Sequence, residues 1–314
     1  MRNIAIFLAS ALCLFQSVNA NDHAEDGSRK TGFPEISTFA RYVPERADDF
    51  AWENDKVAFR TYGPALREKN ENSGIDCWLK RVDYPIINKW YKNNNYHKDQ
   101  GEGLDSYKVG DSRGCGGTAL WIDGKMVTSN VYTDWKVIKA EKEKSVFVLS
   151  YAYAVGADTY TEEKTISIKL GDRLFKSSSV FTKNGERAEG LPVAIGLVLS
   201  KGHRVSEDLD KGWMATWGKN LKTKLGTGVV LAPDRIEEFI VQDSGKDLSD
   251  HALFIAKTDT DGRVEHYAGY GWSAANEMTT SEEWNAYLAG FKGSPVSRIS
   301  YPLPPVSCLL SPVP

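Results

Sequence analysis

Two long runs of alternating and β-branched residues, joined by a two-residue turn, limit the folds open to this chain most strongly. Residues 159–170 read TYTEEKTISIKL, Gly171-Asp172 follows, and residues 173–182 again favour an extended strand. A short connection containing glycine between two such runs is typical of a β-hairpin. The sequence therefore predicts an antiparallel sheet through the middle of the chain.

Shorter runs of the same kind surround this hairpin on both sides, at residues 56–62, 125–133, 145–153, 191–199, 229–231, 238–241, 251–256 and 263–270. Turn pairs such as Asp123-Gly124, Asn184-Gly185 and Asp261-Gly262 separate several of them. Many strands with few helices indicate an all-β fold, an antiparallel sandwich or barrel.

One helix is clearly predicted, near the C-terminal end. Thr280 and Glu283 have the spacing of a capping box, and an apolar stripe follows at Trp284, Tyr287, Leu288 and Phe291. A second, shorter helix is possible within residues 84–92.

The first residues predict export. A positive Arg2, an apolar run from Ile4 to Phe15 and a small-residue cleavage site make residues 1–20 a signal peptide. Residues 21–38 are polar and expected to be disordered or extended, residues 39–293 to form one β-sandwich catalytic domain, and residues 294–314 a proline-rich tail. We expect a periplasmic or secreted protein with no membrane partner, since no later stretch is long and apolar enough to cross a bilayer.

Charge and cysteine content restrict the function further. A net charge of −3 argues against nucleic acid, which requires a concentrated basic field. Three cysteines remain after residue 20, and Cys77 and Cys115 are either a disulfide or two buried thiols. No Cys/His spacing resembles a zinc site, and we expect neither a metal nor another cofactor. The oligomeric state stays open.

The segment 91–121 is the strongest candidate for a functional site. It combines glycines with many ionisable residues, and such a loop on a rigid β scaffold is where binding and catalysis are usually found. His97 is the first candidate for proton transfer, because imidazole titrates near neutral pH. His203, which follows an apolar strand, is the second.

Four blocks of sequence resemble a bacterial domain-of-unknown-function family (number 4861). They are residues 39–55 (FARYVPERADDFAWEND), 59–66 (FRTYGPAL), 74–78 (GIDCW), and 96–99 (YHKD) through Gly116-Gly117. The resemblance implies a galactose-mutarotase-like β-supersandwich with a concave ligand face. It also implies a substrate class: uronic-acid polysaccharides such as pectin, alginate or ulvan.

Elimination between C4 and C5 of a uronate needs a base for the C5 proton, an acid for the departing oxygen, and cations on the carboxylate. We assign His97 or His203 as the base, Tyr107 as the proton donor, and Arg113 with Lys98 as the carboxylate clamp. Further substrate-binding candidates are Asp99, Glu102 and Trp90. The protein would then be an oligosaccharide dehydratase if water leaves and a lyase if a sugar leaves.

Three alternatives remain open. A mutarotase or epimerase would pair His203 with Glu102 or Asp99. A glycoside hydrolase would use two of the carboxylates Asp99, Glu102 and Asp105. A carbohydrate-binding protein without activity would instead present tryptophans to an oligosaccharide.

Overall fold

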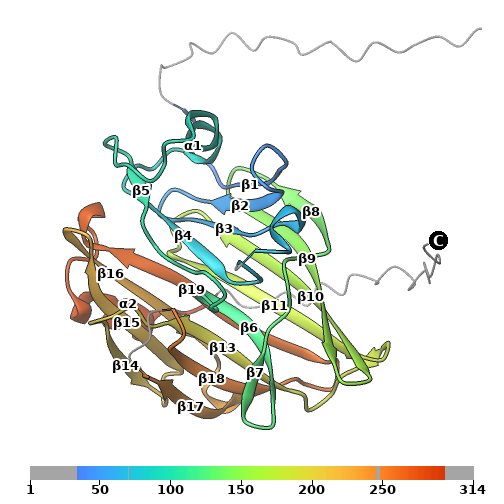
Figure 1. The fold of residues 1–314 in the computed structure, drawn as a ribbon. Coiled ribbons are helices and arrows are strands. Elements are labelled where there is room, and N and C mark those ends of the chain that lie inside the picture. The colour runs from blue at the N-terminus through green and yellow to red at the C-terminus, as the bar shows by residue number, and fades with distance from the viewer. Residues whose placement is uncertain (1–33, 70, 245–247, 294–314) are drawn as a thin grey trace, which may run out of the picture. The chain divides into compact units, whose positions relative to one another are not determined.

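The computed structural model describes residues 34–69, 71–244 and 248–293, and β-strands dominate them (Figure 1). The strands are β1 (Phe39–Val43), β2 (Asp49–Glu53), β3 (Ala58–Thr61), β4 (Ile75–Lys80), β5 (Gly103–Asp105), β6 (Cys115–Ile122), β7 (Lys125–Val127), β8 (Asp134–Ala140), β9 (Lys144–Val155), β10 (Asp158–Lys169), β11 (Leu174–Lys183), β12 (Glu186–Arg187), β13 (Pro192–Val198), β14 (Arg204–Asp208), β15 (Trp213–Asn220), β16 (Thr223–Val230), β17 (Ile236–Gln242), β18 (His251–Lys257) and β19 (Arg263–Trp272). The α-helices are α1 (Ile87–Asn93) and α2 (Ser281–Gly290). The expected all-β antiparallel supersandwich with few short helices is confirmed.

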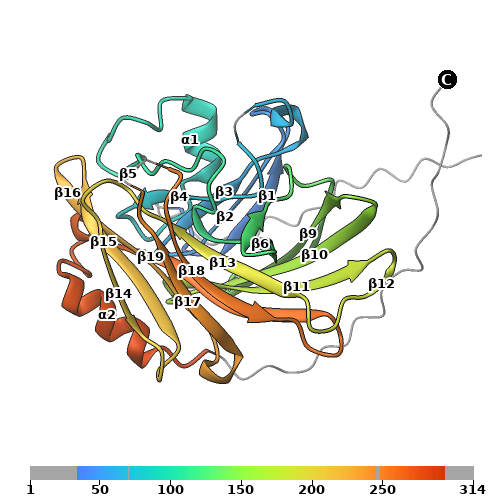
Figure 2. The same ribbon diagram turned by 60° about the horizontal axis from the view of Figure 1, so that its bottom comes forward.

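The strands form three antiparallel sheets (Figure 2). The largest has nine strands, in the order β14-β15-β16-β19-β11-β10-β9-β8 with β12 paired to β11. Two sheets of five strands follow the orders β1-β2-β3-β4-β5 and β17-β18-β13-β6-β7. The predicted hairpin lies at the centre of the large sheet, where β10 pairs with β11.

Both smaller sheets pack against the large one through its apolar face. Phe50 of β2 stacks on Phe147 of β9 with ring centroids 4.4 Å apart. On the other small sheet, Gly116 of β6 lies so near Ala268 of β19 that a Cβ at Gly116 would be 2.2 Å from the Ala268 side chain. The hydrophobic core is therefore continuous across all three sheets.

Helix α2 begins with the predicted capping box, which is confirmed. The Glu283 amide donates to Thr280 Oγ1 at 3.2 Å, and the Glu283 carboxylate accepts from the Thr280 amide at 3.1 Å. Trp284 and Leu288 are buried against β15 and β16, and Trp284 Nε1 donates to the Thr227 carbonyl at 3.2 Å. The second expected helix is α1, at the end of the stretch proposed for it.

The sheet β1–β5 carries charged side chains on the face that points away from the core. Side chains alternate along a strand, so Asp49 and Glu53 of β2, Arg60 of β3 and Lys80 of β4 share this face with Trp78. All are buried. Helix α1 and the loop after it cover this face, as Figure 1 shows.

Helix α1 is held on this face by a buried carboxylate. Glu53 accepts from the amides of Ile86 and Ile87 at 2.9 Å, which satisfies donors at the helix N-terminus. Lys80 Nζ lies 2.9 Å from the same carboxylate and balances its charge. The start of the loop 94–102 is thereby anchored.

Some expectations fall on residues outside the described ranges. These include the signal peptide, residues 21–33, the tail 294–314 and Cys308. Residues 34–38 form neither helix nor strand, and the Thr38 hydroxyl donates to the Glu141 carbonyl at 2.6 Å. In the part of the chain that is described, no helix has the length and apolar character needed to cross a membrane.

Candidate functional site

Four charged side chains from neighbouring strands meet beneath α1 and the loop 94–102. We call Arg60, Asp49, Asp76 and Asp105 the Arg60 cluster. Arg60 Nε donates to Asp76 Oδ2 at 2.8 Å, Nη2 donates to Asp105 Oδ2 at 2.9 Å, and Nη1 lies 3.5 Å from Asp49 Oδ2. The register explains the first contact, because Arg60 and Asp76 are directly opposite on β3 and β4.

Burial shifts the titration of these carboxyl groups upward. It raises the pKa of Asp49 to about 6, against the attraction of Arg60. It raises the pKa of Asp105 well above the usual value, and the charge of Asp76 adds to this effect. Burial also raises the pKa of Asp76. The Arg60 guanidinium contacts all three carboxyl groups, with Arg46 as a second cation near Asp49, and burial favours retention of a proton in the cluster.

Aromatic rings enclose the cluster. Tyr91 and Tyr96 both pack on Trp78, each with ring centroids 4.7 Å apart. The Arg60 guanidinium carbon lies 5.2 Å from the Trp78 ring centroid and 5.6 Å from that of Tyr96, within cation–π range. Tyr91 also donates its hydroxyl to Asp49 Oδ2 at 3.1 Å.

His97 lies at the surface directly above this buried charge. Its side chain is 67% exposed, and Nδ1 is 3.5 Å from Asp105 Oδ2 and 3.2 Å from the Asp105 main-chain oxygen. A carbonyl oxygen only accepts hydrogen bonds, so Nδ1 carries the proton of the neutral ring. The unprotonated nitrogen, Nε2, is then the one available to a solute, which is the geometry of an oriented general base.

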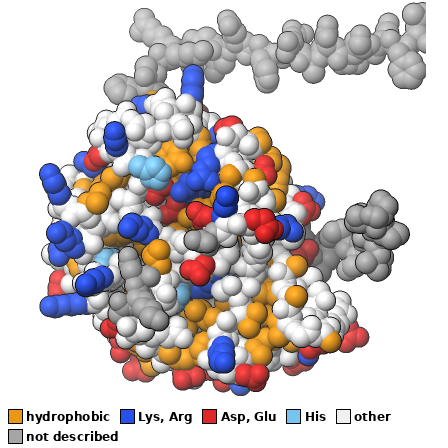
Figure 3. All heavy atoms as spheres, in the orientation of Figure 1, with side chains coloured by type: hydrophobic (Ala, Val, Ile, Leu, Met, Phe, Trp, Pro, Cys, Tyr) orange, Lys and Arg blue, Asp and Glu red, His pale blue; other side chains and the backbone are white. Residues whose placement is uncertain are grey.

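A cation contacts the hydroxyl of Tyr96, whose ring also packs against His97. Arg46, in the turn between β1 and β2, is 30% exposed, and its Nη1 is 3.6 Å from Asp49 Oδ1. Its Nε donates to the Tyr96 hydroxyl at 3.4 Å, while the Tyr96 and His97 rings are 4.6 Å apart. Figure 3 shows histidine, basic and acidic side chains gathered on this face below α1.

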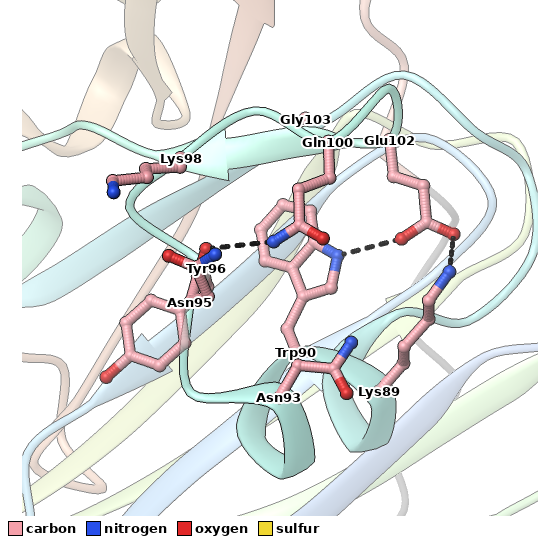
Figure 4. A pocket seen from close by; sticks show the side chains of 9 residues that line it. All are labelled: Lys89, Trp90, Asn93, Asn95, Tyr96, Lys98, Gln100, Glu102 and Gly103. Atoms are coloured by element: carbon pink, nitrogen blue, oxygen red, sulfur yellow. Dashed lines mark hydrogen bonds and ion pairs between the residues drawn. The ribbon is translucent and has the colours of Figure 1, made fainter.

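A small hollow of about 20 Å³, which we call the Trp90 pocket, adjoins this arrangement (Figure 4). Its lining residues are Lys89, Trp90, Asn93, Asn95, Tyr96, Lys98, Gln100, Glu102 and Gly103. Three predicted binding residues, Trp90, Lys98 and Glu102, therefore meet here. The hollow has room for little more than one water molecule, so it does not enclose a sugar ring, and a sugar would contact these groups only from outside it.

Glu102 fixes the side chains around this pocket through three hydrogen bonds. Its carboxylate accepts from Trp90 Nε1 at 3.2 Å, from Lys89 Nζ at 2.7 Å and from the Tyr84 hydroxyl at 2.6 Å. Burial acts to raise the pKa of Glu102, but the hydrogen bonds from Lys89, Tyr84 and Trp90 bring it below its usual value. Asp99 forms an ion pair with Arg81 and accepts from the Gly101 amide at 2.9 Å.

Two assignments need correction, because the side chains lie inside the protein. Arg113 is fully buried and donates to Ser73 Oγ, the Thr118 carbonyl and Asn72 Oδ1 at 2.9, 2.9 and 2.6 Å. Burial lowers the pKa of its guanidinium. Tyr107 belongs to the hydrophobic core, where burial raises the pKa of its phenol well above the usual value. Arg113 is thus not a surface clamp, and Tyr107 does not reach a surface ligand.

His203 lies in the turn between β13 and β14, against β15 rather than beside His97. Its Nε2 is 3.2 Å from the Lys219 carbonyl oxygen. A Cβ at Gly218 would be 2.1 Å from His203 Cδ2, so the ring packs directly on the β15 backbone. The two candidate bases are therefore on separate elements.

Arg46, Asp49, Arg60 and Asp76 were not among the predicted site residues. The pattern that identifies three of them is the alternation in DFAWE, AFRT and IDCWLK, which places Asp49, Arg60 and Asp76 on the same face as other charged residues. Within the described ranges, no group of three or more His, Cys, Asp or Glu side chains is arranged to hold a metal ion. Cys77 and Cys115 are buried free thiols.

Comparison with solved structures gives distant matches. One is a heparan sulfate lyase HepC mutant from Pedobacter heparinus, at 11% identity and a TM-score of 0.39, covering 74% of this chain and 36% of the lyase. Another is the GH36 α-galactosidase AgaB from Geobacillus stearothermophilus, at 9% identity and a TM-score of 0.37, covering 78% of this chain and 43% of that enzyme. This chain spans less than half the length of either, and similarity at this level carries no argument about the reaction.

Comparison of sequences is more specific. The chain is 37% identical over 274 residues to "Uncharacterized protein P7" of Formosa agariphila, covering 82% of this chain and 67% of that protein. The model of one family matches residues 11–299. The chain belongs to this family, described as "Domain of unknown function (DUF4861)".

Proposed function

We propose that this protein is a secreted or periplasmic carbohydrate-active enzyme that acts on uronic-acid oligosaccharides by β-elimination across C4 and C5. One observation carries the proposal: Nδ1 of His97 bonds to the Asp105 main-chain oxygen at 3.2 Å, which leaves Nε2 as an unprotonated base at the surface. Arg46, whose Nε contacts the Tyr96 hydroxyl, supplies a partly exposed cation for the carboxylate.

In this mechanism His97 Nε2 removes the C5 proton while the guanidinium of Arg46 binds the uronate carboxylate. The electrons of the C5–H bond form the C4=C5 double bond, and the C4–O bond breaks. The Tyr96 hydroxyl, which contacts Arg46 Nε at 3.4 Å, protonates the departing oxygen. Solvent then returns a proton to Tyr96 and removes one from His97. The leaving group is water in a dehydratase and a sugar in a lyase.

The second candidate, a mutarotase or epimerase, is favoured by the proximity of His97 and Tyr96. Removal of a proton by His97 from one face and delivery of a proton by the Tyr96 hydroxyl to the opposite face would invert a centre without a lasting double bond. The hydrolase alternative has less support, since Asp99 pairs with Arg81, Glu102 with Lys89 and Asp105 with Arg60. Each of these carboxylates is already held by a cation.

The test is incubation with ulvan, alginate and pectin oligosaccharides, followed by mass spectrometry and ultraviolet absorbance. Loss of one water or a shorter unsaturated product supports elimination, whereas proton exchange without absorbance supports epimerisation. His97→Ala is expected to lower kcat roughly a hundredfold or more, the usual contribution of general base catalysis. Full activity in His97→Ala would refute the assignment.

A further inference from the structure

The hairpin formed by β15 and β16 reaches the candidate site with its tip. Ser106, the residue after Asp105, donates its hydroxyl to Asn220 Oδ1 at 2.7 Å, and Asn220 Nδ2 donates to the Ser106 carbonyl at 3.3 Å. Figures 1 and 2 both show this end of β15 and β16 beside β5. Whatever binds at His97 is therefore next to the residues 219–224, which we call the hairpin tip.

The charge of the hairpin tip is unbalanced. Its sequence, KNLKTK, contains three lysines and no acidic residue, and Lys219, Lys222 and Lys224 are all exposed. Among the described residues, none of the three lysines has an ion-pair partner in the structure. Figure 3 shows basic side chains gathered along the left side of the molecule, where β15 and β16 lie in Figure 1.

Two features of the tip disfavour folding. Lys219 and Lys224 are directly opposite each other across the two antiparallel strands, so like charges face each other on one side of the hairpin. Leu221, between them in the turn, is 62% exposed and has a left-handed backbone with a φ of +52°. A two-residue hairpin turn requires this φ, and here a branched apolar residue adopts it in place of the usual glycine or asparagine, at a cost in strain. A bound anion between the lysines would remove the repulsion.

The hairpin tip is also fixed in place. His203 packs on Gly218 and contacts the Lys219 carbonyl oxygen at 3.2 Å on one side, while Ser106 binds Asn220 on the other. The two lysines are therefore presented on a rigid element rather than on a loose loop. A prearranged pair of cations loses less conformational entropy when an anion binds.

We propose that the hairpin tip binds a second acidic sugar of the chain whose first acidic sugar lies at Arg46 and His97. Lys219 and Lys224 contact its carboxylate, and the Leu221 side chain packs on the apolar face of the pyranose. This inference rests on the proposed function for the identity of the first sugar. It makes the substrate a polyanionic oligosaccharide with at least two acidic residues, not a single free uronate.

The first test measures binding and does not require turnover. The protein is run through native gels that contain polygalacturonate, and through gels that contain the same polymer after methyl esterification. The double variant Lys219→Gln/Lys224→Gln is expected to bind polygalacturonate roughly two- to thirtyfold more weakly, as loss of two exposed charge contacts implies. The control is Lys125→Gln/Lys136→Gln, which removes two exposed lysines from β7 and β8 with the same change in net charge.

The outcomes separate clearly. Loss of retardation in the hairpin variant alone, and only with the charged polymer, supports the proposal. Equal retardation of both double variants, no retardation of the wild type, or equal effects in the esterified gel would overturn it. Thermal unfolding provides a second readout, because removing the facing lysines should leave stability unchanged or higher while binding falls.

A failure of the proposed function looks different. His97→Ala is expected to keep its retardation by polygalacturonate, since the hairpin tip is intact, but to lose turnover. If the wild type shows retardation and no turnover of any uronate oligosaccharide, the elimination is refuted and the polyanion site stands. If turnover occurs and the hairpin variant has an unchanged KM for longer oligomers, the second binding surface is refuted instead.

Discussion

Nδ1 of His97 lies 3.2 Å from the main-chain oxygen of Asp105, and this contact joins a surface loop to the buried Arg60 cluster. The Asp105 carboxylate accepts from Arg60 at 2.9 Å, so the imidazole is supported by a charge network on adjacent strands. Substitutions in the buried Arg60 cluster should therefore change both the free energy of unfolding and the activity that depends on the His97 imidazole.

Replacing Arg60 with methionine is expected to destabilise the fold by about 3–5 kcal/mol, since it leaves buried carboxylates without their cation. The loss should be greater at pH 8 than in acid, because protonation of Asp49, Asp76 and Asp105 relieves the uncompensated charge. Urea unfolding at several pH values measures both effects.

The matched control is Arg46→Met. Arg46 is 30% exposed and its 3.6 Å contact with the buried Asp49 is longer than the contacts of Arg60 with Asp76 and Asp105, so we expect its loss to destabilise the fold less than loss of Arg60 while lowering activity. Equal destabilisation by the two substitutions would contradict the distinct roles given to these arginines.

The dependence of stability on pH should contain two opposing contributions. The pKa of Asp49 is raised from 3.8 to about 6, so its contribution is complete below pH 3.8 and is lost as the pH rises through 6. Burial lowers the pKa of His251 from 6.5 to about 4, so its contribution is complete above pH 6.5 and is lost as the pH falls through 4. The shift of His251 corresponds to a stabilisation on the order of 3 kcal/mol.

Two variants separate these contributions. His251 Nε2 accepts from the Arg113 amide at 3.1 Å, which requires the neutral ring. His251→Gln should be less stable at neutral pH, and its stability should fall as the pH rises from 4 to 6.5, because only the opposing contribution of Asp49 remains. Asp49→Asn should show a steeper rise of stability between pH 4 and 6. Urea unfolding at these pH values measures both effects. If the free energy of unfolding depends on pH in the same way for the wild type and both variants, both assignments are wrong.

Gly103 should be far less tolerant of substitution than Gly101. Both have a left-handed φ, +129° and +99°, so alanine is strained at either position. A Cβ at Gly103 would lie 1.9 Å from the Leu79 carbonyl oxygen, whereas nothing lies within 4 Å of one at Gly101. Because Gly103 pairs β5 with β4, Gly103→Ala should displace Asp105 and lower activity together with stability. The check is to measure activity and thermal unfolding for Gly103→Ala and Gly101→Ala. Equal losses in the two variants would contradict this prediction.

Local patterns were sufficient to predict most of the scaffold. The hairpin of β10 and β11 follows from two β-branched runs around Gly171-Asp172, and the start of α2 follows from Thr280 and Glu283. Both depend on residues close in sequence, where turn chemistry and capping determine the local structure.

The site was predicted only in part, because it depends on contacts between distant segments. His97 and Lys98 were identified from the composition of one loop, and they are exposed there. Arg113 belongs to the same loop by composition, but it lies in the buried stretch 112–120, where its guanidinium packs against Ser73 and Thr118. Residue type alone does not distinguish an arginine that binds a ligand from one that satisfies buried carbonyl groups.

The last prediction concerns His203, the second candidate for the base. Its Nε2 is 3.2 Å from the Lys219 carbonyl oxygen and its ring packs on Gly218, so we expect it to position the hairpin tip rather than to remove a proton. His203→Ala should keep the wild-type kcat on the shortest oligosaccharide that is turned over, and should raise KM for longer anionic chains. Steady-state kinetics on oligomers of increasing length, with His97→Ala in parallel, test this. A loss of kcat on the shortest substrate of roughly a hundredfold, the scale of general base catalysis, would make His203 the base and displace His97 from that role.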